Sequence, residues 1–241
     1  MELIKGIVVS LSKYKDNDAI INVLTKDNIV PINIRGAYSK NSKYLKFAHT
    51  FYEGEFEIYK GNTKYFKLRN VNILFDSESF YGDYSILVCL ELIKEVFTKA
   101  FSNDEFTNNY LLLSTTLRHL SSKNEIIKYT LLYIGFFIRI SGYSIVTNRC
   151  QNNSKDGDVY FSFENGGLVS GKFATNSDIK LDSEEVNILK IIFENKYAIA
   201  ASKLSFENNK YLSILTILCN FISYYNNINI VSLKMLEKIH S

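Results

Sequence analysis

The period of the apolar residues changes once along the chain, near residue 80. Before this point, the apolar residues form short β-branched or alternating runs, separated by turn residues such as Gly61 and Asn62. The five runs are residues 4–11, 19–25, 28–34, 54–60 and 64–75. In the fourth run, Phe56 and Ile58 alternate with glutamates, as in a strand with one buried face. Five strands in about 75 residues are typical of a small closed barrel, and the OB-fold is the usual five-stranded form.

From Tyr84 onward, the apolar residues recur about every 3.6 residues, as they do in helices that bury one face. The expected helices cover residues 84–101, 108–120, 125–140, 183–195, 211–226 and 232–239. We expect Ser183 to be the N-cap of the fourth helix, because Glu184 and Glu185 follow it in the first turn.

Residues 143–176 interrupt the helical pattern with a polar, glycine-containing insert. One short strand signal lies inside it, at residues 158–169. The sequence therefore predicts an α+β multidomain protein, with an OB-fold β-barrel at residues 1–79 and an all-helical domain at residues 80–241. The insert divides this helical domain.

The composition, with 46% apolar and 14% aromatic residues, is that of a globular protein with a sizeable core. A net charge of +3 is too small to hold an anionic partner by a global field, so local basic patches are required. Cys89, Cys150 and Cys219 are sparse, which argues against a disulfide framework and favours a reducing compartment. No apolar stretch reaches the roughly 20 residues of a membrane span, and no signal-peptide pattern is present. We expect a cytoplasmic protein that does not associate with membranes.

The segment Ile34–Phe47, IRGAYSKNSKYLKF, combines four cations with aromatic residues and contains no acidic residue. Cations along a loop can neutralise successive phosphates, and neighbouring rings can stack on bases. A second set of cations without acids follows at residues 60–69, and in a five-stranded barrel both sets can face one groove. The candidate nucleic-acid contacts are Arg35, Lys40, Lys43, Lys46, Lys60, Lys67 and Arg69, with Tyr38 and Tyr44 as stacking rings.

Three features of these two segments favour a plainer interpretation. Lys64 lies in a turn and can simply point into solvent, and Phe47 is expected to belong to the core rather than to a stacking platform. The whole segment can also be a solvated, lysine-rich loop whose tyrosines pack locally.

No motif for covalent catalysis is present: the chain has neither a Walker lysine loop nor a nucleophile elbow. The histidines are scattered, at His49, His119 and His240. A magnesium-dependent nuclease would need clustered carboxylates, and Asp16 and Asp18 are the only close pair near the β-domain, in an ordinary turn. We expect a protein without a cofactor and without enzymatic activity.

Ordered motifs over nearly the whole chain resemble the bacterial recombination mediator family RecO. The motifs are KGIVVSLSKYKDNDAIINVLTKDN at residues 5–28, IRGAYSKNS at 34–42, FYEGEFEIYKG at 51–61, ISGY at 140–143, YFSFENGGLVSG at 160–171 and YYNNINIVSLKML at 224–236. They are similar to that family's first strands, its basic loop and fourth strand, its metal-site region and its last helical segment.

The chain departs from the family at the four-cysteine zinc site that the resemblance implies. Cys150 is present, but its partner position holds Asn153, and the second pair falls at Ser170 and Phe173. One thiolate cannot form a tetrahedral structural zinc site, so we expect no bound metal. The aromatic residues expected to hold this degenerate insert on the helices are Tyr160, Phe161 and Phe163.

The resemblance implies a protein that binds single- and double-stranded DNA and anneals complementary strands. It also implies help in loading the strand-exchange recombinase onto DNA coated by single-strand-binding protein. The implied partners are DNA, RecR and the acidic C-terminal tail of single-strand-binding protein, in the bacterial cytoplasm at the nucleoid. The helical cations considered for that tail, without a firm assignment, are Arg118, Lys123, Lys128 and Arg139. The alternative is a protein-interaction scaffold of the same descent with weak or no DNA binding.

Overall fold

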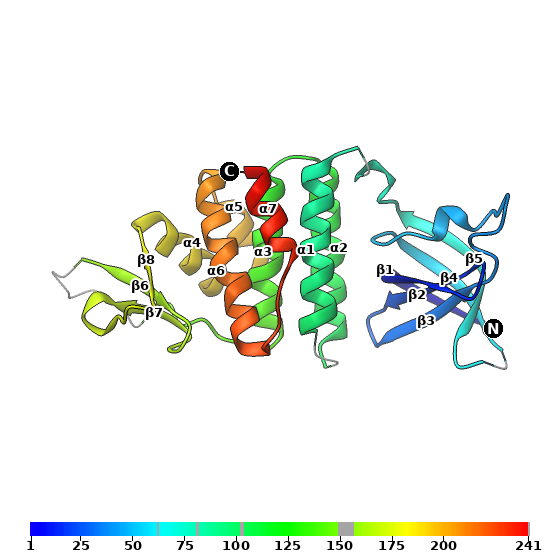
Figure 1. Ribbon diagram of the computed structural model, residues 1–241, viewed down its shortest axis with the longest axis horizontal. Coiled ribbons are helices and arrows are strands. Elements are labelled where there is room, and N and C mark those ends of the chain that lie inside the picture. The colour runs from blue at the N-terminus through cyan, green and yellow to red at the C-terminus, as the bar shows by residue number, and fades with distance from the viewer. Residues whose placement is uncertain (62, 81, 102–103, 149–156, 241) are drawn as a thin grey trace. The chain divides into compact units, whose positions relative to one another are not determined.

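A computed structural model describes the chain except for residues 62, 81, 102–103, 149–156 and 241. The chain forms two compact units. One comprises Met1–Leu87 with Ser102–Ser122, and the other comprises Val88–Phe101 with Lys123–Ser241. The domain boundary expected at residue 79 stays a prediction. The first unit carries the barrel, and the second carries most of the helices (Figure 1).

Five strands of the first unit close into a barrel in the order β1-β2-β3-β5-β4. The strands are β1 (Glu2–Tyr14), β2 (Asp18–Leu24), β3 (Ile29–Ile34), β4 (Glu53–Lys60) and β5 (Phe66–Phe75). Neighbouring strands are antiparallel except for β3 and β5, which pair in parallel. Each predicted apolar run overlaps one of these strands. The predicted five-stranded OB-fold barrel followed by helices is therefore confirmed.

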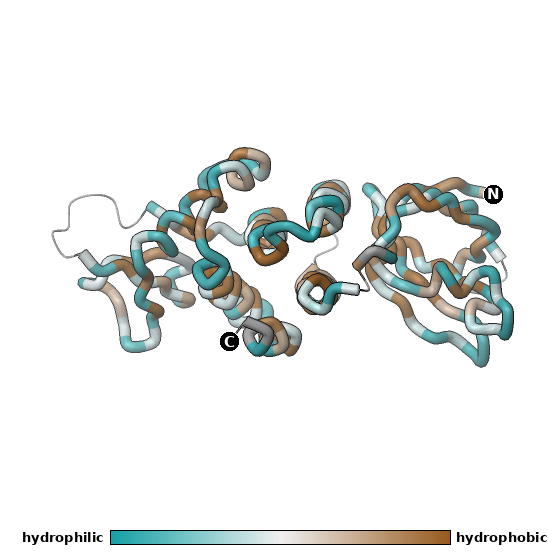
Figure 2. The backbone as a smooth tube through the Cα atoms, turned by 90° about the horizontal axis from the view of Figure 1, so that it is seen from above, coloured by the Kyte–Doolittle hydropathy of each residue, from teal (hydrophilic) through white to brown (hydrophobic). Residues whose placement is uncertain are grey.

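The barrel core follows the period-2 pattern of its strands. On β4, Phe56 and Ile58 are fully buried, whereas Glu55 and Glu57 on the opposite side are partly exposed. Hydrophobic and hydrophilic residues are interspersed along the backbone (Figure 2). Burying one face of each strand therefore selects the register, because a slip by one residue would turn these glutamates into the core.

The helices of the described chain are α1 (Tyr84–Ala100), α2 (Phe106–Ser121), α3 (Ile126–Ile140), α4 (Ser183–Glu194), α5 (Tyr197–Lys203), α6 (Asn208–Asn226) and α7 (Ser232–His240). Six of them match predicted helical segments. Helix α5 was not predicted, because its seven residues are too few for a 3.6-residue period to be recognised. No helix in the described part of the chain is long and apolar enough to cross a membrane.

Helix α3 is central to the core of the second unit and contacts α4, α5 and α6. Gly135 permits the approach of α4, because a Cβ atom there would lie 2.5 Å from the side chain of Ile192. Cys89 on α1 and Cys219 on α6 are fully buried, as expected for cysteines within apolar helical runs.

The start of α4 differs by one residue from the prediction. Its N-cap is Asp182, and the prediction of Ser183 at this position is wrong. The carboxylate of Asp182 accepts hydrogen bonds from the backbone N–H groups of Glu184 and Glu185, at 2.9 and 3.0 Å. The Glu185 side chain in turn accepts from the Asp182 N–H, which completes a capping box and fixes the first turn.

The insert contains a small sheet in the order β7-β6-β8. Its strands are β6 (Val159–Ser162), β7 (Gly167–Ser170) and β8 (Ile179–Leu181). Phe161 packs edge-to-face on Phe221 of α6, and Phe163 stacks on Tyr224 of the same helix. The expected aromatic packing on the helices is thus found for both phenylalanines. Tyr160 is half-buried, and its packing on a helix stays a prediction.

The described residues of the insert do not fit a zinc ion. Ser170 and Phe173 stand at the second pair of ligand positions, and a phenylalanine ring that is 70% exposed offers no donor atom. Within the described ranges, no group of three or more His, Cys, Asp or Glu side chains is arranged to hold a metal. Cys150 and Asn153 lie outside the described residues, so the absence of a bound metal stays a prediction.

Candidate nucleic-acid interface

The basic loop, Ile34–Phe47, is anchored to the barrel at its start by Asp18 of β2. The Asp18 carboxylate accepts a hydrogen bond from the Gly36 N–H at 2.8 Å and a longer one from the Asn33 amide at 3.4 Å. Gly36 has a φ of 65°, a left-handed conformation that glycine adopts without strain. Asp18 therefore serves the turn, which removes it from the carboxylate pair considered for a nuclease.

The end of the basic loop is held by its aromatic residues. Phe47 is buried in the barrel core, as predicted, and its carbonyl accepts a hydrogen bond from the Tyr52 hydroxyl at 3.1 Å. Tyr38 and Tyr44 are partly buried and pack against the same core. Part of each ring that was predicted to stack on bases is therefore already used in packing against the barrel core. The loop cations that the packed rings leave exposed are Arg35, Lys40, Lys43 and Lys46.

A β-bulge on β5 joins the second predicted segment to the basic loop. Leu68 pairs with Ile58 and Asn70 with Glu57, so Arg69 is the extra residue of the bulge. Its carbonyl accepts a hydrogen bond from the Tyr44 hydroxyl at 3.4 Å. In a regular ladder of hydrogen bonds between β4 and β5, this carbonyl would bond to the neighbouring strand. The bulge leaves it available to the Tyr44 hydroxyl.

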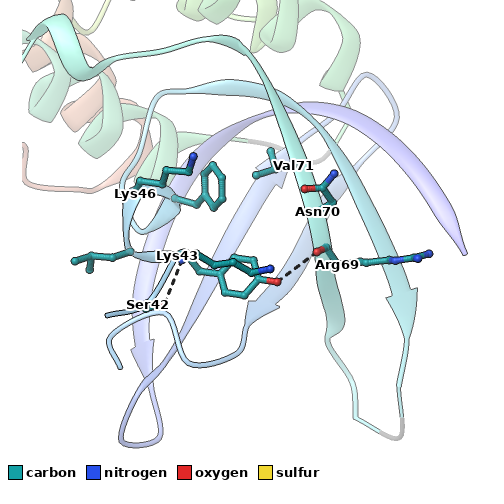
Figure 3. Close-up of a pocket in the computed structure, with 9 residues that line it drawn as sticks. Ser42, Lys43, Lys46, Arg69, Asn70 and Val71 are labelled. Atoms are coloured by element: carbon teal, nitrogen blue, oxygen red, sulfur yellow. Dashed lines mark hydrogen bonds between the residues drawn. The ribbon is translucent and has the colours of Figure 1, made fainter. Parts of the chain in front are cut away.

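The basic loop and β5 enclose an open cleft of about 670 Å³ (Figure 3). Its lining residues are Ser42, Lys43, Tyr44, Leu45, Lys46, Phe47, Arg69, Asn70 and Val71. None of these is acidic. In Figure 3 the Arg69 guanidinium extends away from the loop, and its Nη1 atom lies 3.1 Å from the Met1 sulfur. The cations that flank the cleft on the loop side are therefore Lys43 and Lys46.

Each of these two lysines lies near the aromatic ring that follows it in the sequence. The distance from Nζ to the ring centroid is 5.0 Å for Lys43 and Tyr44, and 5.0 Å for Lys46 and Phe47. Such cation–π contacts contribute about 0.5–1 kcal/mol at exposed sites. The ammonium groups are thus held at the cleft by a weak attraction that a phosphate can replace.

The other predicted contact residues do not line the cleft. Lys60 is exposed at the end of β4, and Lys67 lies with its Nζ 5.9 Å from the ring of Tyr59. Arg35, Lys40 and Tyr38 belong to the first half of the basic loop. The structure therefore brings together part of the predicted set, and the assignment of all these residues to DNA contact stays a prediction.

The sequence did not single out four of the lining residues, Ser42, Leu45, Asn70 and Val71. A regular period-2 strand would place Asn70 on the face opposite Arg69, and the bulge that changes this placement has no recognisable sequence signal. Leu45 is 56% exposed, an apolar side chain at the rim of a basic cleft. The sequence signal that could have placed Leu45 at the cleft is its position between Lys43 and Lys46.

A second polar cluster in the same unit is structural. The Glu53 carboxylate is 2% exposed and accepts hydrogen bonds from the Tyr110 hydroxyl at 2.5 Å and the Arg118 guanidinium at 2.7 Å. Burial raises the pKa of Glu53, but the hydrogen bonds and the charges of Arg118 and Lys5 outweigh it, so the pKa is lowered. This carboxylate ties β4 to α2 and is saturated by the donors of the chain itself.

Three of the cations considered for an acidic tail are also engaged within the chain. Arg118 pairs with Glu53, and Lys128, whose side chain is 7% exposed, pairs with Glu125 at 2.9 Å. Arg139 donates to the carbonyls of Ile192 and Asn195, at 2.8 and 2.5 Å. Each of these three side chains thus already has a partner within the chain.

Comparisons with known proteins match both parts of the chain. Residues 1–75 match the family described as recombination protein O N terminal. A DNA repair protein RecO of Clostridium acetobutylicum is 25% identical over 69% of this chain and 69% of its own length. The DNA repair protein RecO of Clostridium novyi is 23% identical over 82% of this chain and 80% of its own length. That of Mesoplasma florum is 24% identical over 97% of this chain and 89% of its own length. These matches confirm the resemblance predicted from the motifs: the chain is similar to RecO proteins over nearly its whole length.

Proposed function

We propose that this chain is a non-catalytic DNA-binding protein of recombinational repair. It binds single- and double-stranded DNA, anneals complementary strands and helps load the strand-exchange recombinase onto DNA coated by single-strand-binding protein. The observation that carries this proposal is the acid-free cleft of the barrel, flanked by Lys43 and Lys46 and extended along the loop by Arg35 and Lys40. It lies in the segment that matches the RecO family.

Annealing follows from the chemistry of such a surface. Two complementary strands repel each other through their phosphates, and a protein that neutralises phosphates on both strands lowers this repulsion. Contacts to the backbone do not depend on sequence, so they leave base pairing to select the partner strand. No covalent step is needed for this activity.

The proposed partners besides DNA are RecR and the acidic C-terminal tail of single-strand-binding protein, in the bacterial cytoplasm at the nucleoid. Both protein partners come from the family resemblance. Because Arg118, Lys128 and Arg139 already serve contacts within the chain, we do not place the tail on these residues.

The proposal is tested by the salt dependence of binding to a labelled single-stranded oligonucleotide, measured by fluorescence anisotropy. Each neutralised phosphate of a single strand contributes about 0.7 to the slope of log affinity against log salt. We expect a wild-type slope of roughly −3, from four or five contacts. The variant Lys40→Gln/Lys43→Gln/Lys46→Gln removes three cations and should make the slope shallower by about 2.

A matched control removes three exposed lysines of the other unit, in the variant Lys172→Gln/Lys196→Gln/Lys234→Gln. It changes the net charge equally, and its slope should stay at the wild-type value. An equal effect of both variants would show a general charge effect. Absence of DNA binding in the wild type would contradict the proposal and favour the protein-interaction scaffold.

A further inference from the structure

We infer that the cleft between the basic loop and β5 takes a single unpaired base of a DNA strand. In this inference the ring of Tyr44 exchanges the Lys43 ammonium for the base, and the Asn70 amide binds the base edge. The inference rests on the proposed function, because it names the part of the DNA that this site receives.

The size of the cleft agrees with a nucleotide. Its volume of about 670 Å³ lies within the range of sites that enclose small organic ligands. A base inside a duplex is stacked on both faces and paired at its edge, so it would have to be flipped out at an energetic cost. A base of a single strand can enter without that cost.

The chemistry of the lining matches a base with its flanking phosphates. Phe47 and Val71 are almost fully buried and supply an apolar floor, and Leu45 adds an exposed apolar rim. Lys43 and Lys46 have no carboxylate partner among the described ion pairs, so their charges are available to phosphates. A purely phosphate-binding groove would not require the apolar part.

Asn70 is an uncharged polar residue that β5 contributes to this lining, next to Arg69. Within the described residues, its amide has no hydrogen-bond partner in the chain. An amide offers two donors and an acceptor, which suits the mixed donors and acceptors of a base edge. In Figure 3, Asn70 lies nearer to the basic loop than the Arg69 guanidinium does.

The Lys43 ammonium lies on the face of the Tyr44 ring that the base would occupy, so it has to leave the ring when the base binds. The ammonium lies 5.0 Å from the ring centroid, and the Tyr44 hydroxyl, bound to the Arg69 carbonyl, fixes the ring. A cation–π contact at an exposed site is weaker than the stacking of a base on an aromatic ring. When a strand enters, the Lys43 ammonium can move to a phosphate while the base takes its place on the ring.

The test compares a twelve-nucleotide thymidine strand with a strand of equal length in which every base is absent. Both carry the same phosphates, so their affinities for the full chain differ only through the bases. We expect the wild type to bind the thymidine strand at least about fivefold more tightly, as base–aromatic stacking predicts. Tyr44→Leu and Asn70→Ala should each reduce this ratio by weakening only the thymidine complex.

Two further variants isolate the role of the ring. Tyr44→Phe keeps the aromatic face and should retain the ratio. Phe173→Leu alters a ring of the other unit that also lies near its preceding lysine, at 5.9 Å from Lys172, and it should leave the ratio unchanged. Unchanged binding of the base-free strand shows that each variant is folded.

The outcomes separate this inference from the proposed function. Equal affinity of the wild type for both strands would overturn the base site and leave a protein that binds DNA through phosphates. A ratio that survives Tyr44→Leu would also overturn it, because the base would then be bound elsewhere. Failure to bind either strand would overturn the proposed function and the inference together.

Discussion

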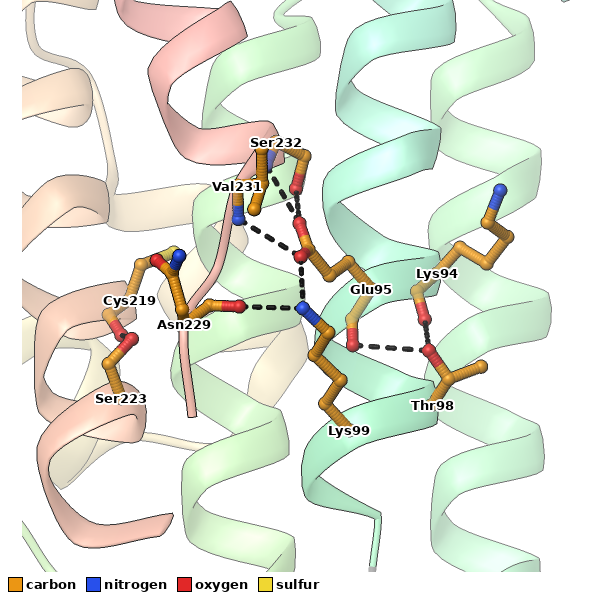
Figure 4. Close-up of polar contacts among 9 residues, drawn as sticks. All are labelled: Lys94, Glu95, Thr98, Lys99, Cys219, Ser223, Asn229, Val231 and Ser232. Atoms are coloured by element: carbon orange, nitrogen blue, oxygen red, sulfur yellow. Dashed lines mark hydrogen bonds and ion pairs between the residues drawn. The ribbon is translucent and has the colours of Figure 1, made fainter. Parts of the chain in front are cut away.

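Replacing Glu95 by Gln is expected to destabilise the helical unit at neutral pH. The Glu95 carboxylate on α1 accepts hydrogen bonds from the backbone N–H groups of Val231 and Ser232, at 2.9 and 2.7 Å (Figure 4). The Ser232 hydroxyl also donates to it, and Lys99 forms an ion pair with it at 2.6 Å. Glu95 thereby caps the first turn of α7, where unpaired N–H groups favour a negative charge.

The magnitude follows from the acidity of this carboxyl. Burial raises its pKa, but the hydrogen bonds from Lys99, Ser232 and Val231 outweigh burial and lower the pKa from 4.5 to about 2. One pKa unit corresponds to about 1.4 kcal/mol, so the charged form contributes up to about 3 kcal/mol. The Lys99 side chain is 40% exposed, and glutamine keeps an acceptor oxygen. We therefore expect Glu95→Gln to lower the free energy of unfolding by about 2 kcal/mol at pH 7.

The sign of the pH dependence is fixed by the lowered pKa. A carboxyl that is more acidic in the folded than in the unfolded chain stabilises the fold above its unfolded pKa. This contribution declines as the pH falls from 4.5 towards 2, because the carboxyl of the unfolded chain takes up a proton before that of the folded chain does. The difference between wild type and variant should be full at pH 7, smaller at about pH 3.5, and absent near the folded pKa.

The measurement is urea denaturation followed by circular dichroism at several pH values. Glu91→Gln is the matched control, because it makes the same change on the same helix at an exposed pair with Lys94. We expect Glu91→Gln to lower the free energy of unfolding by less than about 0.5 kcal/mol. A Glu95→Gln effect no larger than that of the control, or one that is constant with pH, would refute the capping role.

Further predictions concern three other positions. Glu53→Gln should destabilise the barrel unit by about 2 kcal/mol in urea denaturation, because a buried carboxylate with charged donors is lost. Gly167→Ala should lower the free energy of unfolding by about 2–4 kcal/mol in urea denaturation, since the φ of Gly167 is 155° and the new Cβ would lie 2.3 Å from the Val146 carbonyl oxygen. Gly171→Ala is the control and should have a small effect, because the nearest atoms to its new Cβ would lie 3.4 Å away. Asp18→Asn should weaken DNA binding in the anisotropy assay by loosening the basic loop, although it removes a negative charge. A simple charge effect would instead tighten binding.

The fold could be predicted from the sequence where burial and periodicity agree. Phe56 and Ile58 alternate with glutamates, and this pattern alone selects a strand with one buried face. The prediction of Ser183 as N-cap was wrong because Asp182 and Ser183 are both good caps. The choice depends on which one has an extended backbone, and only Asp182 does.

The site was less predictable because its geometry depends on contacts between distant residues. The bulge at Arg69 places its carbonyl beside Tyr44, 25 residues earlier, and nothing in the local sequence marks it. The burial of Glu53 depends on Tyr110, which lies 57 residues away. Contacts between residues so far apart in the sequence form only in the folded chain, so composition and apolar periodicity do not predict them.

The most direct measurement is photo-crosslinking of a single strand that carries 5-iodouracil, followed by mass spectrometry of the crosslinked peptides. We expect the crosslinks to map to residues 43–47 and 69–71, which line the cleft. The crosslinks should disappear in Tyr44→Leu while the base-free strand still binds. Crosslinks confined to residues 88–101 and 123–241, in the other unit, would contradict DNA binding by the barrel.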